Sequence, residues 1–226
     1  VRRVDHQVDE DLLHLVGVHR HVGKRRVQLH DQPDAAQGEL VFDHLGGLHN
    51  FKSIYLVDTP FTRQFRGKDN FYRVPEPVYL GNFDHMVVPP FKVARLIQPD
   101  ETIDLGGLKV RLISVPGHTQ DEVALFDETH NILLAGDHVY PSWLLAGNLK
   151  DYVASLDATL KVINEKTAIY GAHADEDPTK VPAMTYADVQ AIRDKMALIL
   201  AGRAKGEAFS DPELIKSSEL YKVEKD

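Results

Sequence analysis

Histidine and aspartate recur in this chain at places where an apolar segment ends beside glycine. Four such places carry Asp43-His44, His118, Asp137 and His173, each with a glycine within two residues. Glycine lets the backbone turn tightly there, so these side chains can be aimed at a common point. Imidazole and carboxylate groups bind Zn²⁺, and a metal open to water lowers the pKa of that water and polarises a carbonyl. The pattern therefore predicts a metal site with hydrolytic chemistry.

The ordered set from residue 42 to residue 173, with Gly46-Gly47 after the first pair, resembles the metallo-β-lactamase superfamily. The resemblance implies an αββα sandwich that usually binds two metal ions between its sheets. It also implies a role for each residue: Asp43, His44 and His173 hold the second metal, His118 belongs to the first, and Asp137 bridges the two. Tyr140 resembles the tyrosine that lactone-cleaving members place near the substrate carbonyl. The catalytic residues implied are thus Asp43, Asp137 and Tyr140.

The sequence departs from the family motif His-x-His-x-Asp-His, because the corresponding window reads Glu39-Leu40-Val41-Phe42-Asp43-His44. In the family the two leading histidines and the residue matching His118 form the first metal site. That site here keeps one histidine and the bridging carboxylate, whereas zinc sites normally have at least three protein ligands. His19-Arg20-His21 could fold back as a replacement, although 21 residues separate it from Asp43.

Residues 1 to 41 differ in amino-acid composition and in residue pattern from the rest of the chain. They contain no Phe, Trp or Tyr and hold five of the twelve histidines, and their polar residues follow neither a helical nor a strand period. We therefore expect an atypical segment over residues 1–40 and a metallo-β-lactamase-like domain over 41–226, with an incomplete or atypical first sheet. One hypothesis is that residues 1–40 are foreign to the fold, as in a fusion or an upstream frameshift.

The later part of the chain predicts strands and helices in alternation, typical of an α/β fold with helices packed on sheet faces. A helix near Leu149–Asn164 has one apolar face, and a second near Tyr186–Ala204 begins with a capping box of Thr185 and Asp188. The expected strands are Ser53–Val57, Lys92–Gln98, Leu108–Leu112, Glu122–Phe126, Asn131–Leu134 and Ala168–Tyr170.

The overall composition of the chain argues against several classes of function. The 226 residues are 43% hydrophobic and contain no cysteine, so any metal is held by His and carboxylate groups. No apolar run reaches the roughly 18 to 20 residues of a membrane span, and no secretory signal opens the sequence, which favours the cytoplasm. A net charge of −8 without a basic stripe argues against nucleic acid and for a small-molecule substrate.

The first functional interpretation is a hydrolase in which a metal-bound hydroxide attacks an ester, thioester, lactone or lactam. Zinc is the expected metal, as one or two ions, and iron or manganese also suit such ligands. The alternative is a catalytically inactive protein of the same fold that serves as a binding module, which the two absent histidines favour. Metal content and chelator-sensitive hydrolysis distinguish these hypotheses.

Overall fold

The computed structural model describes residues 35–37, 42–45, 48–75, 88–141, 144–173, 181–209 and 220–223. The chain divides into two compact units, Val1–Ile97 and Gln98–Asp226. The expected boundary near residue 40 and the His19-Arg20-His21 pair lie outside the described residues. No helix in the described part of the chain is long and apolar enough to cross a bilayer.

The first unit contains a four-stranded sheet in the order β1-β2-β4-β3. Strand β2 is parallel to β1 and β4, whereas β3 is antiparallel to β4. Leu45, Leu48, Ile54, Leu56 and Phe91 are buried in the core of this unit. Its elements are β1 (Ala35–Gln37), α2 (Phe42–Leu45), η1 (Leu48–Asn50), β2 (Ile54–Val57), α3 (Pro60–Arg63), β3 (Phe71–Tyr72) and β4 (Phe91–Ile97).

The second unit contains a six-stranded sheet in the order β11-β10-β8-β7-β6-β5. Strands β5 to β8 form an antiparallel meander, but β10 is parallel to β8, so the chain between them must cross over. The strands are β5 (Thr102–Asp104), β6 (Lys109–Ser114), β7 (Val123–Asp127), β8 (Ile132–Gly136), β10 (Ala168–Gly171) and β11 (Ala183–Met184). Because β8 and β10 are parallel neighbours, their carboxyl ends lie at one edge of the sheet.

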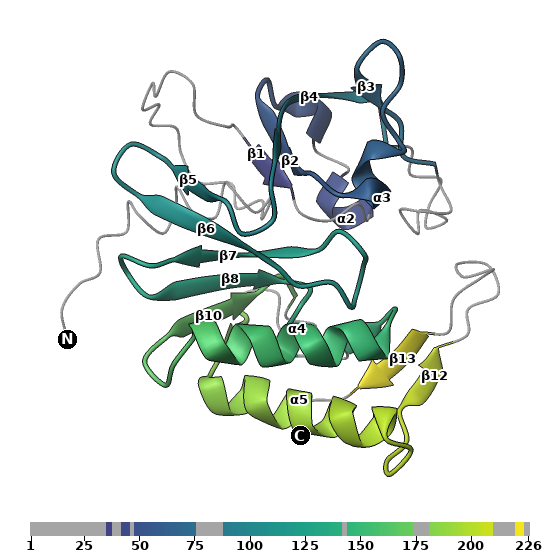
Figure 1. Cartoon of the computed structure of the whole chain (residues 1–226), viewed down its shortest axis with the longest axis vertical. Coiled ribbons are helices and arrows are strands. Elements are labelled where there is room, and N and C mark those ends of the chain that lie inside the picture. The colour runs from purple at the N-terminus through teal and green to yellow at the C-terminus, as the bar shows by residue number, and fades with distance from the viewer. Residues whose placement is uncertain are drawn as a thin grey trace. The chain divides into compact units, whose positions relative to one another are not determined.

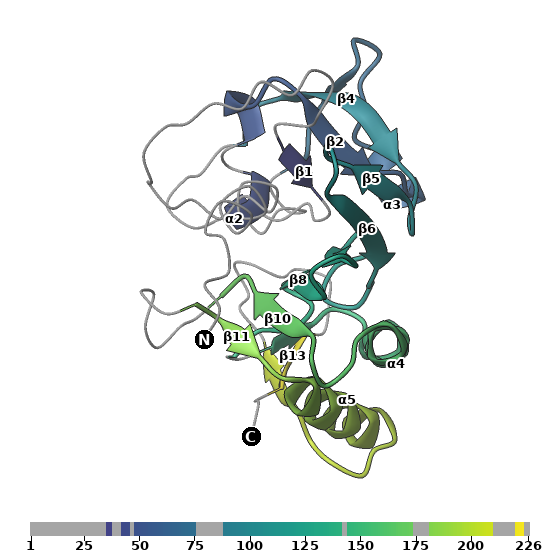
Figure 2. The same cartoon turned by 90° about the vertical axis from the view of Figure 1, so that its left-hand side faces the viewer.

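Two helices of the second unit lie side by side (Figures 1 and 2), α4 (Leu149–Val162) in the crossover and α5 (Tyr186–Leu200) after β11. Helix α4 buries Tyr152 and Leu156 in the same core as β6, β7 and β8, which confirms the apolar face predicted from the sequence. The predicted capping box of α5 is present, since Thr185 and Asp188 each accept a hydrogen bond from the other's backbone amide. A three-stranded sheet, β12-β13-β9, completes the unit with β12 (Glu207–Phe209), β13 (Leu220–Val223) and β9 (Leu144–Ala146).

Candidate metal centre

Asp137 lies immediately after β8, at the edge of the six-stranded sheet. Gly136 has a φ of 59°, a left-handed conformation that glycine adopts without strain, and it turns the chain out of the strand at this point. The Asp137 side chain is only 5% exposed. A carboxylate so deeply buried is costly unless positive charge or hydrogen-bond donors surround it. Its surroundings therefore indicate what it binds.

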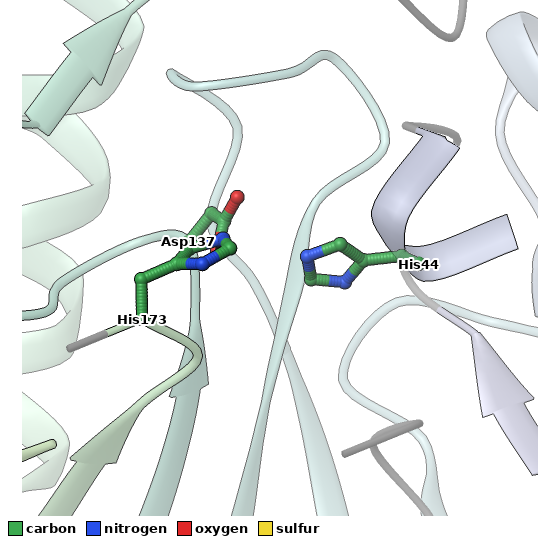
Figure 3. Close-up of side chains that lie close together, drawn as sticks. All are labelled: His44, Asp137 and His173. Atoms are coloured by element: carbon green, nitrogen blue, oxygen red, sulfur yellow. The ribbon is translucent and has the colours of Figure 1, made fainter. Parts of the chain in front are cut away.

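Two imidazoles face Asp137 within the second unit, one at each carboxylate oxygen. Nε2 of His118 lies 3.5 Å from Oδ2, and Nε2 of His173 lies 3.1 Å from Oδ1. Figure 3 shows the Asp137 and His173 side chains pointing toward one another from the ends of β8 and β10. The structure thus brings together three of the predicted ligands. His118 is 7% exposed and His173 36% exposed, so the solvent reaches this centre on the His173 side.

The orientation of His118 is set by its other ring nitrogen. Nδ1 lies 2.7 Å from the backbone carbonyl of Leu145, which can only accept a hydrogen bond, so Nδ1 carries the hydrogen. In the neutral imidazole, Nε2 then presents a lone pair to the Asp137 carboxylate. Two acceptors that face each other are stabilised by a cation between them, and outer contacts of this kind orient histidine ligands in metal sites. The donor set therefore fits a divalent cation.

His173 follows a close approach between the end of β10 and the turn after β8. Gly171, the last residue of β10, packs so tightly that a Cβ there would lie 2.4 Å from both the Tyr140 Cβ and the Val139 carbonyl oxygen. Tyr140 is buried, and its ring meets that of His173 edge-on at a centroid distance of 5.2 Å. The sequence-predicted contact of Tyr140 with a substrate carbonyl stays a prediction. The structure places this residue against a candidate ligand.

The acidic residues beneath the site were not predicted from the sequence. Glu122 is fully buried, and burial raises the pKa of its carboxyl well above the ordinary value, with the charges of Asp137 and Asp121 raising it further. The backbone amide of His118 acts in the opposite direction. The raised pKa of Glu122 shows that negative charge in this region is costly, and a bound cation would reduce that cost.

The other two predicted ligands belong to the first unit. His44 lies on α2, where its side chain is half-buried and offers an imidazole nitrogen. Asp43 lies on the same short helix, and its side chain is outside the described residues. The ligand roles of Asp43 and His44 stay predictions.

His138, next to Asp137, makes the stability of the second unit depend on pH. Its ring is fully buried against Thr159, and burial, assisted by the charge of His118, lowers its pKa from 6.5 to about 3. Between these pH values the unfolded chain binds a proton that the folded chain does not, so stability falls as the pH falls from about 6.5 to about 3. The full loss in the free energy of unfolding across this pH range is about 4 to 5 kcal/mol.

We expect this loss in chelator-treated protein, measured as the free energy of unfolding by urea at several pH values. His138→Gln removes the titrating ring and flattens the curve in that window. A variant with the same pH dependence as the wild-type chain would contradict the assignment.

Comparisons with known proteins support the fold. No family model matches the chain. The chain is 31% identical over 138 residues to the chicken (Gallus gallus) protein "Acyl-coenzyme A thioesterase MBLAC2", covering 54% of this chain and 49% of that protein. It spans about half the length of the curated relatives of that name that it matches.

Two solved structures show the same fold. An archaeal metallo-β-lactamase superfamily protein from Sulfolobus tokodaii matches with a TM-score of 0.52 at 18% identity, over 78% of this chain and 70% of that one. A metallo-β-lactamase family protein from Thermus thermophilus matches with a TM-score of 0.52 at 15% identity, over 84% and 79%. The chain thus has the metallo-β-lactamase fold, as predicted from the sequence.

Proposed function

We propose that this protein is a metal-dependent hydrolase that cleaves a thioester. The observation that carries the proposal is the buried Asp137 carboxylate with an imidazole at each oxygen, His118 at 3.5 Å and His173 at 3.1 Å. Hydrolases of this kind need a cation held by a few protein groups with one side open to substrate. The half-exposed His173 supplies the open side.

The metal would be held by His173 and Asp137 together with His44 and Asp43 of the first unit. His118 would contribute to a neighbouring position that Asp137 also reaches, as a bridging carboxylate does. The order of these residues along the chain supports the assignment, as does the chemistry of the donors, which suits zinc and also iron or manganese. A bound divalent cation supplies a Lewis acid for the carbonyl and an acidified water as the nucleophile.

The residues of this chain have separate tasks in such a reaction. Asp137 holds the two imidazoles at a fixed spacing. Leu145 keeps the hydrogen of His118 on Nδ1, so that Nε2 faces the site. Tyr140 limits the rotation of the His173 ring and, in the proposal, also lies near the substrate carbonyl. The buried positions of Asp137 and His118 exclude water from the inner side of the centre.

A thioester is proposed as the substrate because the curated relatives are named acyl-coenzyme A thioesterases. We expect the wild-type chain to hydrolyse an acyl-coenzyme A faster than a lactone or a chromogenic β-lactam, with thiol release followed by a colorimetric reagent. A chelator should abolish the activity, and added zinc should restore it. Equal rates with and without metal would contradict the proposal.

One observation favours a second candidate, an inactive protein of the same fold. Glu39 and Val41 stand where the family motif has histidines, so one metal position has few ligands. This candidate predicts at most one metal per chain and no hydrolysis of any of the three substrates. Metal analysis of the same preparation separates the two candidates.

A further inference from the structure

One face of helix α4 contacts two of the three segments of the second unit that carry predicted ligands, the His118 loop and the Asp137 turn. Asn148, Tyr152, Ser155 and Thr159 are spaced by three or four residues, so they lie on the same side of the helix. Tyr152, Ser155 and Thr159 are buried, and we call these three the α4 polar face. The contacts of this face divide between the turn that carries Asp137 and the loop that carries His118.

The Asp137 turn is bound through its backbone and through the next side chain. The Tyr152 hydroxyl lies 3.2 Å from the Asp137 carbonyl oxygen and also donates to the His138 carbonyl. The Thr159 hydroxyl lies 3.0 Å from Nε2 of His138. Buried carbonyl groups require donors, and this turn follows the end of β8, where the sheet no longer supplies them. The Tyr152 hydroxyl therefore shares its one hydrogen between the carbonyl groups of Asp137 and His138.

The His118 loop is bound to the same helix one turn away. The Ser155 hydroxyl donates to the Pro116 carbonyl at 2.6 Å. The backbone amide of Asn148 donates to the Gly117 carbonyl at 2.8 Å. Gly117 packs so closely that a Cβ there would lie 2.5 Å from the Tyr152 Cα. Tyr152 thus contacts the residue before His118 with its backbone and the carbonyl of Asp137 with its hydroxyl.

We infer that the α4 polar face sets the spacing between His118 and Asp137, with Tyr152 as a positioning residue for the metal centre. The inference rests on the proposed function, in which both residues are ligands. A rigid helix that binds both segments fixes their separation, whereas neither segment is part of a strand or helix of its own. Groups that hold ligands in place commonly change metal affinity 10- to 100-fold when removed.

Tyr152→Phe tests the inference, because it keeps the ring and removes the hydroxyl. We expect about 10-fold weaker binding of zinc, measured by competition with a chromogenic chelator, and altered visible bands of the cobalt(II)-loaded protein. Tyr72→Phe is the matched control. Tyr72 is also buried, and its hydroxyl forms no hydrogen bond with the described residues, so both readouts should match the wild-type chain.

A crystal structure of metal-free Tyr152→Phe decides the question independently of metal binding. The separation of 3.5 Å between His118 Nε2 and Asp137 Oδ2 should change, together with the path of residues 136–138. Unchanged zinc affinity with an unchanged separation would overturn the inference. If the wild-type chain takes up no metal, the proposed function fails, and the crystal structures of the two metal-free proteins still decide whether Tyr152 sets the spacing.

Discussion

Asp137→Ala should abolish metal binding and lower thioester hydrolysis by about 10³-fold or more, which corresponds to about 4 kcal/mol of transition-state stabilisation. Asp137 is the group that both His118 and His173 face, at 3.5 and 3.1 Å. Without it the two imidazoles lose their shared partner, and no carboxylate remains between them. Metal content by mass spectrometry of the native protein and the rate of thiol release measure the two effects.

The same substitution should leave the metal-free protein as stable as the wild-type chain or more stable. It removes a buried negative charge that raises the pKa of Glu122, and burying like charges near one another is costly. Asp127→Asn is the control, because Asp127 is also fully buried and lies at the other end of the β7–β8 pair. It binds the backbone amides of Thr129 and His130. Asp127→Asn should lower the free energy of unfolding of the protein and leave its metal binding unchanged.

The elements of the second unit were predictable because their apolar residues follow clear periods. The predicted helix near Leu149–Asn164 is observed as Leu149–Val162, and the predicted strand Ala168–Tyr170 as Ala168–Gly171. Regular burial on one face of a helix or strand leaves a period in the sequence. The His and Asp residues that stand after such strands were predictable for the same reason, since a strand end and a glycine mark each one.

The supporting contacts were not predictable, because they join residues far apart in the chain. Ser155 and Pro116 are 39 residues apart, and Thr159 and His138 are 21 apart. A serine or threonine within a helix has the same local sequence signal whether it faces solvent or a buried carbonyl. Glu122 was assigned to a strand, but its full burial depends on what packs around it. The sequence thus indicates the candidate ligands better than the residues that support them.

Gly171→Ala should destabilise the second unit by about 3 kcal/mol and weaken metal binding at the same time. A methyl group at this position meets backbone atoms, the Val139 carbonyl at 2.4 Å and the Tyr140 Cα at 2.7 Å, which cannot move aside as a side-chain tip can. The end of β10 must therefore separate from the turn after β8. Because Ala172 donates a hydrogen bond to the Gly136 carbonyl across this junction, the shift moves His173 relative to Asp137.

Gly202→Ala isolates the clash from the general effect of replacing glycine. Gly202 has a φ of 69° and no heavy atom within 4 Å of an added Cβ, so alanine there is strained but not crowded, at a cost of about 1 kcal/mol. Urea unfolding of both variants, each with and without zinc, measures the comparison. An equal decrease in the free energy of unfolding of both variants would show that the contact between Gly171 and Tyr140 adds nothing to the general effect of replacing glycine. A larger loss at Gly171, accompanied by weaker zinc binding, would show that close packing of the end of β10 against the turn after β8 holds His173 beside Asp137.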